Sequence, residues 1–343
     1  MKYSFKNDYS EGAHPRILEA LLKSNMEQQN GYGLDEFSLA AEKLIQEKLN
    51  NSVSRVYFVS GGTQANLIVI SAILRPHESV VAAATGHIFT NESGAIESTG
   101  HKVHGVETGD GKLRCEDIQN VLDIHTNVPH QVKQKLVYIS NSTEIGTQYS
   151  KTELEDLSEF CRKHKLYLFM DGARLGNALT SEHNDLALED IGRLTDAFYV
   201  GGTKNGALIG EAIVINNPDL QAEFGFHIKQ KGAMLAKGRL LGIQFHELLK
   251  DDLYFELAAH ANMQAMRLKE AFRNIGCSFL AETYTNQIFP ILNLGMIDKL
   301  SQNFDFYVWK KIGDGTSAIR IITSWATQEE TVDKFIEEIS ALN

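Results

Sequence analysis

The chain has 343 residues, of which 43% are hydrophobic and 22% are charged. This is the composition of an ordinary globular protein, and the length predicts two domains of about 150 residues each. The formal net charge of −11 argues against partners that require a basic surface, namely nucleic acid and anionic membranes.

The cysteines and the N-terminus indicate a cytoplasmic protein. Cys115, Cys161 and Cys277 are isolated and form no CxxC pair, so neither a zinc knuckle nor a disulfide framework is predicted. Reduced thiols fit a reducing compartment. The first ten residues contain no apolar signal core, and no run of about 18 apolar residues occurs. The spacing of the histidines predicts no metal site.

Short β-rich segments alternate with longer amphipathic segments over the first two thirds of the chain. Apolar spacing predicts helices at 64–74 and 151–164. The predicted strands lie at 55–59, 79–84, 102–107, 135–140, 166–170, 195–200 and 212–215. Strands and helices in series imply crossover connections, and therefore a mostly parallel sheet with helices on both faces.

The pattern changes after about residue 217. Long helical stretches are predicted to about Leu249 and over 253–273, and short strands near 287–292, 304–308 and 318–323. A last helix is predicted near Thr327, where Thr327-x-x-Glu330 resembles a capping box. We interpret this part as a smaller α+β domain. The predicted domains are residues 1–245, whose N-terminal segment can pack on the other domain, and residues 246–343.

The strongest chemical signal is the pair Asp171 and Lys204. Asp171 ends the buried strand LYLFM, and Lys204 follows the next strand inside the glycine-rich loop GGTKNG. Ligands bind at the carboxyl ends of parallel strands, and glycines let a ligand approach the backbone. A lysine there can form a Schiff base, and an aspartate one strand away can pair with a pyridinium nitrogen, as in pyridoxal-phosphate enzymes. Singly, each could be a turn lysine or a helix cap, but together they favour the cofactor.

A second signal is the turn Ser60-Gly61-Gly62-Thr63 between a predicted strand and a predicted helix. Its backbone amides and the Thr63 hydroxyl can hold a phosphate group at the N-terminus of the helix. Glycine pairs at helix starts are common, so this motif supports a cofactor site only in combination with Lys204.

The order of several segments resembles the threonine aldolase and β-eliminating lyase family, which has the aspartate-aminotransferase-like fold. The shared segments are Asn7-Asp8, Tyr32-Gly33, SGGTQAN, TGHIF with His87, MDGAR, the Lys204 loop and Arg320 in AIRIITSW. The resemblance covers most of the chain. It implies an α/β protein of pyridoxal-phosphate fold type I, with a mostly parallel seven-stranded sheet in the large domain and a small α+β C-terminal domain.

The resemblance also implies the residues that bind the cofactor, pyridoxal 5'-phosphate. Lys204 would hold it covalently, Asp171 would keep the pyridine nitrogen protonated, and His87 would stack on the ring. Gly62, Thr63 and Thr203 would face the phosphate. His87 could instead be a core histidine.

The substrate residues implied by the resemblance are two arginines and two N-terminal residues. Arg174 and Arg320 would bind the α-carboxylate, because a guanidinium fork matches two oxygens. Asn7 would lie on the substrate side, and Tyr32 would reach the site of a neighbouring subunit in a homodimer or homotetramer. Arg320 could instead form a simple ion pair, and Tyr32 could be ordinary loop packing.

The chain departs from the family pattern in three places. The acid–asparagine–threonine–histidine run after the fourth strand is replaced by Ser140-Asn141-Ser142-Thr143-Glu144, which has no histidine. Asn7 stands where the family has serine. The Gly-Gly-Gly-Met-Arg-Gln stretch is Lys231-Gly232-Ala233-Met234-Leu235-Ala236, without the arginine. The cofactor and carboxylate residues are complete, whereas the part that contacts the β-substituent is altered.

The predicted activity is a lyase that cleaves the Cα–Cβ bond of a β-hydroxy-α-amino acid into glycine and an aldehyde. A base must remove the β-hydroxyl proton, and His87, acting through a water, is the leading candidate. A β-eliminating lyase or an aminotransferase would use the same cofactor residues and form different products. A non-catalytic cofactor-binding protein is disfavoured, because only chemistry requires Lys204.

Overall fold

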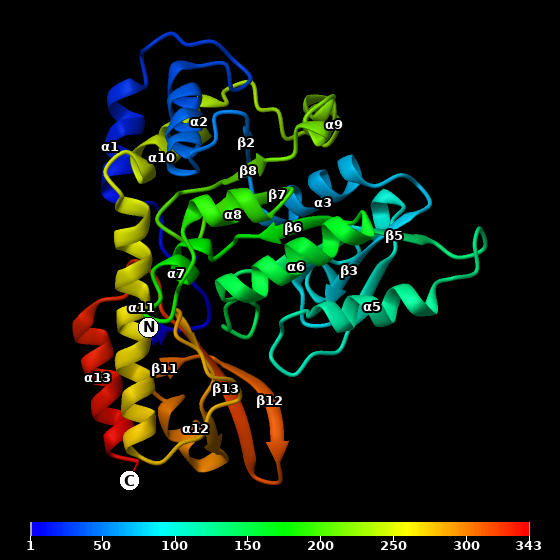
Figure 1. Cartoon of the computed structure of the whole chain (residues 1–343). Helices are drawn as coiled ribbons and strands as arrows, with labels where there is room; N and C mark the ends of the chain where they lie inside the picture. Colours follow the sequence, from blue (N-terminus) through cyan, green and yellow to red (C-terminus); the bar gives the residue numbers. More distant parts are fainter. Residues whose placement is uncertain (1, 343) are drawn as a thin grey trace.

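A seven-stranded sheet forms the centre of the larger of two lobes (Figure 1). The computed structural model describes residues 2–342. The strands are β2 (Arg55–Val59), β3 (Glu78–Ala83), β4 (Val103–Val106), β5 (Lys133–Ser140), β6 (Tyr167–Asp171), β7 (Ala197–Gly201) and β8 (Glu211–Ile215), in the order β2-β8-β7-β6-β5-β3-β4. β8 is antiparallel to β2 and β7, and the other neighbouring strands are parallel. The mostly parallel sheet that the sequence predicts is therefore confirmed.

Helices cover both faces of this sheet, so β3, β7 and β8 are buried over their whole length. One face carries α5 (Cys115–Ile124), α6 (Lys151–His164) and α8 (Leu188–Leu194), and the other carries α3 (Gly62–Ile73) and α9 (Phe224–Gln230) (Figure 1). Because side chains alternate along a strand, Tyr138, Phe169 and Tyr199 all point to the α3 side. Asp171, two residues after Phe169, belongs to the same face.

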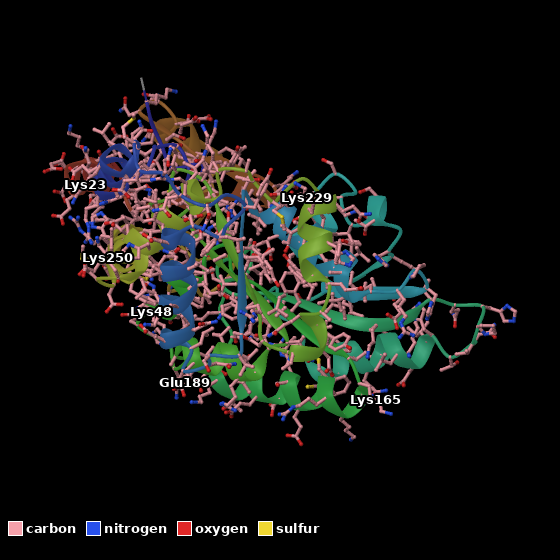
Figure 2. The ribbon with its side chains drawn as sticks, turned by 90° about the horizontal axis from the view of Figure 1, so that it is seen from above. Lys23, Lys48, Lys165, Glu189, Lys229 and Lys250 are labelled. Carbon is pink, nitrogen blue, oxygen red and sulfur yellow. The ribbon has the colours of Figure 1, made fainter. Side chains whose placement is uncertain are left out.

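A layer of three helices lies beyond the β2 edge of the sheet (Figure 1). It consists of α1 (Pro15–Ser24), α2 (Glu36–Lys48) and α10 (Arg239–Leu249). Charged side chains such as Lys23 on α1, Lys48 on α2 and Lys250 after α10 lie at the periphery of the molecule (Figure 2). The charges therefore lie away from the apolar contacts between these helices.

The predicted helical stretch from about 217 to Leu249 is wrong. It is divided into a 3-10 turn (Pro218–Leu220), α9, a connection and α10. α9 ends at Gln230, and Gly232 adopts φ 71° shortly after it. Glycine in this left-handed conformation ends a helix at little steric cost, so the break is encoded locally.

The small lobe combines a four-stranded sheet with long helices. Its sheet contains β9 (Gln287–Ile288), β10 (Ile291–Asn293), β12 (Tyr307–Gly313) and β13 (Thr316–Ile322), and its helices are α11 (Leu253–Asn274), α12 (Leu294–Leu300) and α13 (Glu329–Ser340). Figure 1 shows α11 running along both lobes, beside α7 (Leu175–Leu179) and α13. No helix within residues 2–342 is long and apolar enough to cross a membrane.

The N-terminal segment packs on the small lobe. β1 (Tyr3–Ser4) pairs with β11 (Phe304–Asp305), and Phe5 is fully buried between Phe304 and Phe335. α10 crosses residue 245, where we placed the domain boundary, and ends at Leu249. The connection between α10 and α11 therefore lies a few residues after that position.

The predicted capping box at Thr327 is also wrong. α13 begins at Glu329, and Gln328 at its N-terminus makes no side-chain capping hydrogen bond. The Thr327 hydroxyl instead accepts a hydrogen bond from the backbone N–H of Ser324 at 2.8 Å. It closes the turn that precedes the helix, which the motif alone does not distinguish from a cap.

Candidate active site

A cavity of about 590 Å³ opens where the carboxyl ends of the parallel strands meet the small lobe. Its lining includes Tyr9, the turn Ser60–Thr63, His87, Ser140, Glu144, Asp171, Arg174, Lys204, Glu211, Trp309 and Arg320. A larger and more open groove of about 700 Å³ beside α11 and Tyr284 contains none of the predicted site residues. Strand-end position, rather than size, identifies the active site.

Asp171 is held by four hydrogen bonds at the base of this cavity. Tyr138 and Tyr199 donate their hydroxyls to Oδ2 and Oδ1 at 2.6 and 2.5 Å, and Asn66 and the Ala173 amide donate at 3.1 and 2.9 Å. Burial opposes ionisation, but the two tyrosines and the nearby His87 outweigh it and lower the pKa of Asp171. Asp171 is therefore a buried anion, which is the partner that a pyridinium nitrogen requires.

Two glycines allow the Asp171 and Lys204 loops to approach each other. The Gly201 amide donates to the Gly172 carbonyl at 3.0 Å. A Cβ at Gly172 would lie 1.8 Å from the Tyr199 carbonyl oxygen, and one at Gly201 would lie 2.5 Å from the Ala173 carbonyl oxygen. No side chain fits at either position, so this contact depends on the glycine that follows Asp171 and on the one that ends β7.

Lys204 lines the cavity beside a carboxylate that the sequence analysis missed. Burial and the positive charge of Arg174 lower the pKa of Lys204, which favours the neutral, nucleophilic amine. Because β8 is antiparallel, its first residue, Glu211, lies at the same edge of the sheet. Its Oε2 accepts a hydrogen bond from Gly202 at 2.9 Å, and burial raises its pKa to about 7, against the attraction of Lys204.

The turn before α3 is free to hold a phosphate. α3 begins at Gly62, and Gly61 before it makes no side-chain capping hydrogen bond. The Ser60 amide and hydroxyl donate to Oε1 of Gln64 at 3.1 and 2.9 Å, so the amides of Gly62 and Thr63 are the candidate donors to a phosphate. A Cβ at Gly62 would lie 3.1 Å from the Tyr199 hydroxyl. This turn, Thr203 and Lys204 line the same cavity. The amides of the turn therefore fit the phosphate of pyridoxal phosphate, the Lys204 amine fits its aldehyde, and the Asp171 carboxylate fits its protonated ring nitrogen.

His87 is the first residue of the short helix α4 (His87–Thr90) and is tethered by a buried acid. Its Nδ1 lies 2.7 Å from Oε1 of Glu92, which also accepts a 2.7 Å hydrogen bond from Asn66. Burial lowers the pKa of His87, but Glu92 and Asp171 outweigh it and raise the pKa. His87 is therefore biased toward the imidazolium form. The chain Asp171–Asn66–Glu92–His87 was not predicted.

The two arginines differ in their partners. Arg174 donates two hydrogen bonds to the fully buried Asp8, at 2.7 and 3.0 Å. Arg320 donates to the Gln287 side chain, lies 4.9 Å from the Trp309 ring centroid, and buries its Nε without a partner. Burial and repulsion from Arg174 lower the pKa of Arg320 to about 10. Within residues 2–342 Arg320 forms no ion pair with a carboxylate, whereas Arg174 is paired with Asp8, so Arg320 is the more available anion site of the two.

Two predicted substrate residues, Asn7 and Tyr32, do not line the cavity. The Asn7 side chain accepts hydrogen bonds from the Tyr9 amide at 3.0 Å and the Ser10 hydroxyl at 2.9 Å, which fixes a turn. Tyr32 is 53% exposed and has a left-handed φ of 61°. Its ring centroid lies 4.7 Å from Nζ of Lys229, which Figure 2 places on α9 at the outside of the molecule. Both roles stay predictions.

The missed residues left weak signals in the sequence. Tyr138 and Tyr199 are polar interruptions of apolar strands, two residues before the strand ends, which places them on the face of Asp171. Glu211 is the single charged residue in the strand EAIVI. Asp8 belongs to the motif Asn7-Asp8, which by itself does not indicate that the carboxylate pairs with Arg174. Each signal is ambiguous until the sheet order is known.

The comparisons with known proteins agree with this geometry. A model of the β-eliminating lyase family matches residues 8–294. The chain is 32% identical to a low specificity L-threonine aldolase of Pseudomonas aeruginosa, over 98% of this chain and 96% of the relative. Among solved structures, a threonine aldolase of Leishmania major is 51% identical and has a TM-score of 0.97 over 99% of each chain.

A more distant structure extends the fold relationship. An aspartate aminotransferase of Thermus thermophilus has 15% identity and a TM-score of 0.73, over 100% of this chain and 92% of that one, and so shares the fold. The predicted fold type I architecture and family are thereby confirmed. The chain belongs to the β-eliminating lyase family and, within it, to the threonine aldolases, which are pyridoxal-phosphate-dependent lyases.

Proposed function

We propose that this protein binds pyridoxal phosphate at Lys204 and cleaves β-hydroxy-α-amino acids of the L-threonine type into glycine and an aldehyde. The observation that carries the proposal is the meeting of Lys204, the buried Asp171 anion and the uncompensated Arg320 in one cavity. Bound pyridoxal phosphate supplies an electron sink for the electron pair of the broken Cα–Cβ bond.

Each cavity residue has a defined task in this proposal. Asp171 keeps the ring nitrogen protonated, the Gly62–Thr63 amides hold the phosphate, and His87 covers the ring. Arg320, assisted by Arg174, binds the α-carboxylate and so decides which bond at Cα is aligned for cleavage. The L configuration and broad tolerance of the β-substituent are proposed by analogy with two relatives, which are low specificity L-threonine aldolases.

Product analysis tests the activity directly. The purified protein, supplied with pyridoxal phosphate, is incubated with L-threonine, L-allo-threonine and their D enantiomers. We expect equal amounts of glycine and acetaldehyde from the L substrates. Ammonia with a keto acid would indicate β-elimination instead, and a new amino acid formed from an added keto acid would indicate an aminotransferase. Either result would overturn the proposal.

We expect Arg320→Ala to lower kcat/KM for every α-amino acid substrate with a smaller loss of stability than Arg174→Ala. Losing one side of a buried charged contact costs about 2–5 kcal/mol, which is tens to thousands of fold at about 1.4 kcal/mol per factor of ten. The apoprotein loses a buried cation without an ion-pair partner, together with its hydrogen bond to Gln287 and its contact with Trp309, so its Tm is expected to fall less than that of Arg174→Ala. Steady-state kinetics and thermal unfolding measure the two effects.

Arg174→Ala is the matched comparison for this prediction. It should lower both kcat/KM and Tm, because Asp8 is left buried without its ion-pair partner, at a cost of about 3–5 kcal/mol. The double variant Arg174→Ala/Asp8→Asn should recover part of the stability that Arg174→Ala loses. Equal losses of stability in the two arginine variants would contradict the different roles assigned to them.

We also infer a homodimer or homotetramer, with Tyr32 facing a neighbouring subunit. Large apolar side chains on and near α1 and α2 are exposed: Leu18, Leu22, Met26, Leu34 and Leu39. Such a patch is typical of a protein interface, and two-fold assembly is the commonest outcome for soluble oligomers. We expect sedimentation to give a dimer or tetramer that Leu22→Glu weakens. A stable, active monomer would contradict the inference.

The cytoplasm is the location we propose. Cys115, Cys161 and Cys277 are all free thiols in the structure, which suits a reducing compartment. Fractionation of the source cells, followed by detection of the protein with an antibody, tests this location.

A further inference from the structure

We propose that Glu144 accepts the proton of the substrate β-hydroxyl, in place of the histidine that the family carries in this segment. The inference rests on the proposed function and names the base that the cleavage requires.

The first argument is position. The segment Ser140-Asn141-Ser142-Thr143-Glu144 stands where the family carries its histidine-containing run, and Glu144 is the one ionisable side chain in it. Glu144 follows the end of β5, and it lines the same cavity as Asp171, Arg174 and Arg320. The departure from the family pattern is thus a replacement of one proton-accepting side chain by another.

The second argument is the way the carboxylate is held. Oε1 of Glu144 accepts hydrogen bonds from the His87 backbone amide at 2.9 Å and from the Ser140 hydroxyl at 2.7 Å. The hydrogen bonds from His87 and Ser140 both go to Oε1, and Oε2 is not among the buried atoms without a partner. One oxygen is therefore fixed by the protein, and the other is left for a ligand in the cavity.

The third argument is basicity. Burial, together with repulsion from Asp171, raises the pKa of Glu144 and outweighs the hydrogen bonds from Ser140 and the backbone. General base catalysis is most effective when the pKa of the base lies near the working pH, so a raised carboxylate pKa favours proton transfer. Glu144 is thus a stronger base than an exposed glutamate.

The competing groups are committed elsewhere. The His87 ring is tied through Nδ1 to Oε1 of Glu92 at 2.7 Å, and in the proposed function it covers the cofactor ring. Asp171 already accepts four hydrogen bonds beneath the ring site. Glu211, the remaining carboxylate in the lining, is bound to the Gly202 amide beside Lys204. His87 acting through water, our prediction from the sequence, is thereby disfavoured.

The proton transfer balances without any further reactant. The O–H bond of the β-hydroxyl breaks, its proton moves to Oε2 of Glu144, and its electron pair forms the carbonyl of the aldehyde as the Cα–Cβ bond breaks. The Cα–Cβ electron pair stays on the glycine fragment, which takes up a proton at Cα. Glu144 then returns its proton to water.

The test compares Glu144→Gln with the wild-type holoenzyme. Glutamine keeps the oxygen that accepts from His87 and Ser140 but cannot take a proton. We expect cleavage of L-threonine and L-allo-threonine to fall by about 10²–10⁴-fold, the usual contribution of a general base. Glycine has no β-hydroxyl, so its dissociation constant from spectral titration, and exchange of its α-proton with deuterated water, should change less than about threefold.

Further readouts separate proton transfer from folding. Glu144→His should recover part of the cleavage rate, with its lower pH limit moved toward that of imidazole. The Tm of the Glu144→Gln apoprotein should equal or exceed that of wild type at pH 8. A raised carboxyl pKa means that the charged form is unfavourable in the folded state, so this difference should shrink as pH falls through the raised pKa of the folded state and should be gone below about 4.5, the ordinary value.

Two results would overturn the inference. One is cleavage by Glu144→Gln within tenfold of wild type. The other is a parallel loss of cleavage, glycine binding and α-proton exchange, which would assign Glu144 to the structure of the site. A wild-type enzyme that binds and exchanges glycine but does not cleave threonine would instead refute the proposed function, so the two failures are distinguishable.

Discussion

Lys204→Ala is expected to abolish covalent binding of pyridoxal phosphate and to lower cleavage on the order of 10⁴-fold or more, as loss of a covalent catalytic residue does. Lys204 is the single lysine in the lining of the cavity, and its lowered pKa favours the neutral, nucleophilic amine. Borohydride reduction followed by peptide mass mapping measures the attachment directly.

Lys204→Arg is the control for charge. Arginine keeps a cation in the cavity but has no amine that can condense with an aldehyde. Lys204→Arg should therefore lose covalent cofactor binding and cleavage as completely as Lys204→Ala. Because the lysine pKa is lowered, loading of the wild-type protein should continue to a lower pH than for an ordinary exposed lysine. Attachment of the cofactor to another lysine, such as Lys229 or Lys231, would refute the assignment of the site.

Asp171→Ala is expected to retain part of the cofactor and to lose nearly all turnover, on the order of 10³-fold or more, because an unprotonated pyridine is a poor electron sink. Asp171→Asn should be almost as inactive, since an amide cannot stabilise the pyridinium charge. A structure of the holoenzyme should place the Asp171 carboxylate about 2.7–2.9 Å from the ring nitrogen, as in other charge-assisted hydrogen bonds. A ring nitrogen beyond hydrogen-bond reach of Asp171 would end this assignment.

The same substitutions have a separate effect on stability. In Asp171→Ala, the buried hydroxyls of Tyr138 and Tyr199 lose their acceptor, which costs about 1–3 kcal/mol for each unsatisfied group. The pKa of Asp171 is lowered in the folded protein, so its contribution is present above the ordinary carboxyl pKa and is lost as pH falls through the folded value. The Tm difference between wild type and Asp171→Asn should therefore shrink in acid.

Strand periodicity and strand-end placement account for what could be predicted from the sequence. Buried strands and crossover helices leave a local signal, which is why 151–164 matches α6 and why Asp171 and Lys204 were found at neighbouring strand ends. The capping motif at Thr327 failed because a hydroxyl can serve a preceding turn as well as a helix. A local sequence motif therefore predicts structure well only when it is compatible with a single local conformation.

By itself, the sequence determined the sheet, the family and the two residues at the centre of the chemistry. Their signals are local: alternation, glycine flanks and short motifs. Only the tertiary structure decided the partners of each charge, because Asp8 meets Arg174 and Glu144 meets the His87 backbone across long stretches of chain. These contacts depend on strand order and register, which set the neighbours of a side chain and which periodicity does not encode. For the same reason, the lack of an ion-pair partner for Arg320 and the available oxygen of Glu144 could not be recognised before the two lobes were assembled.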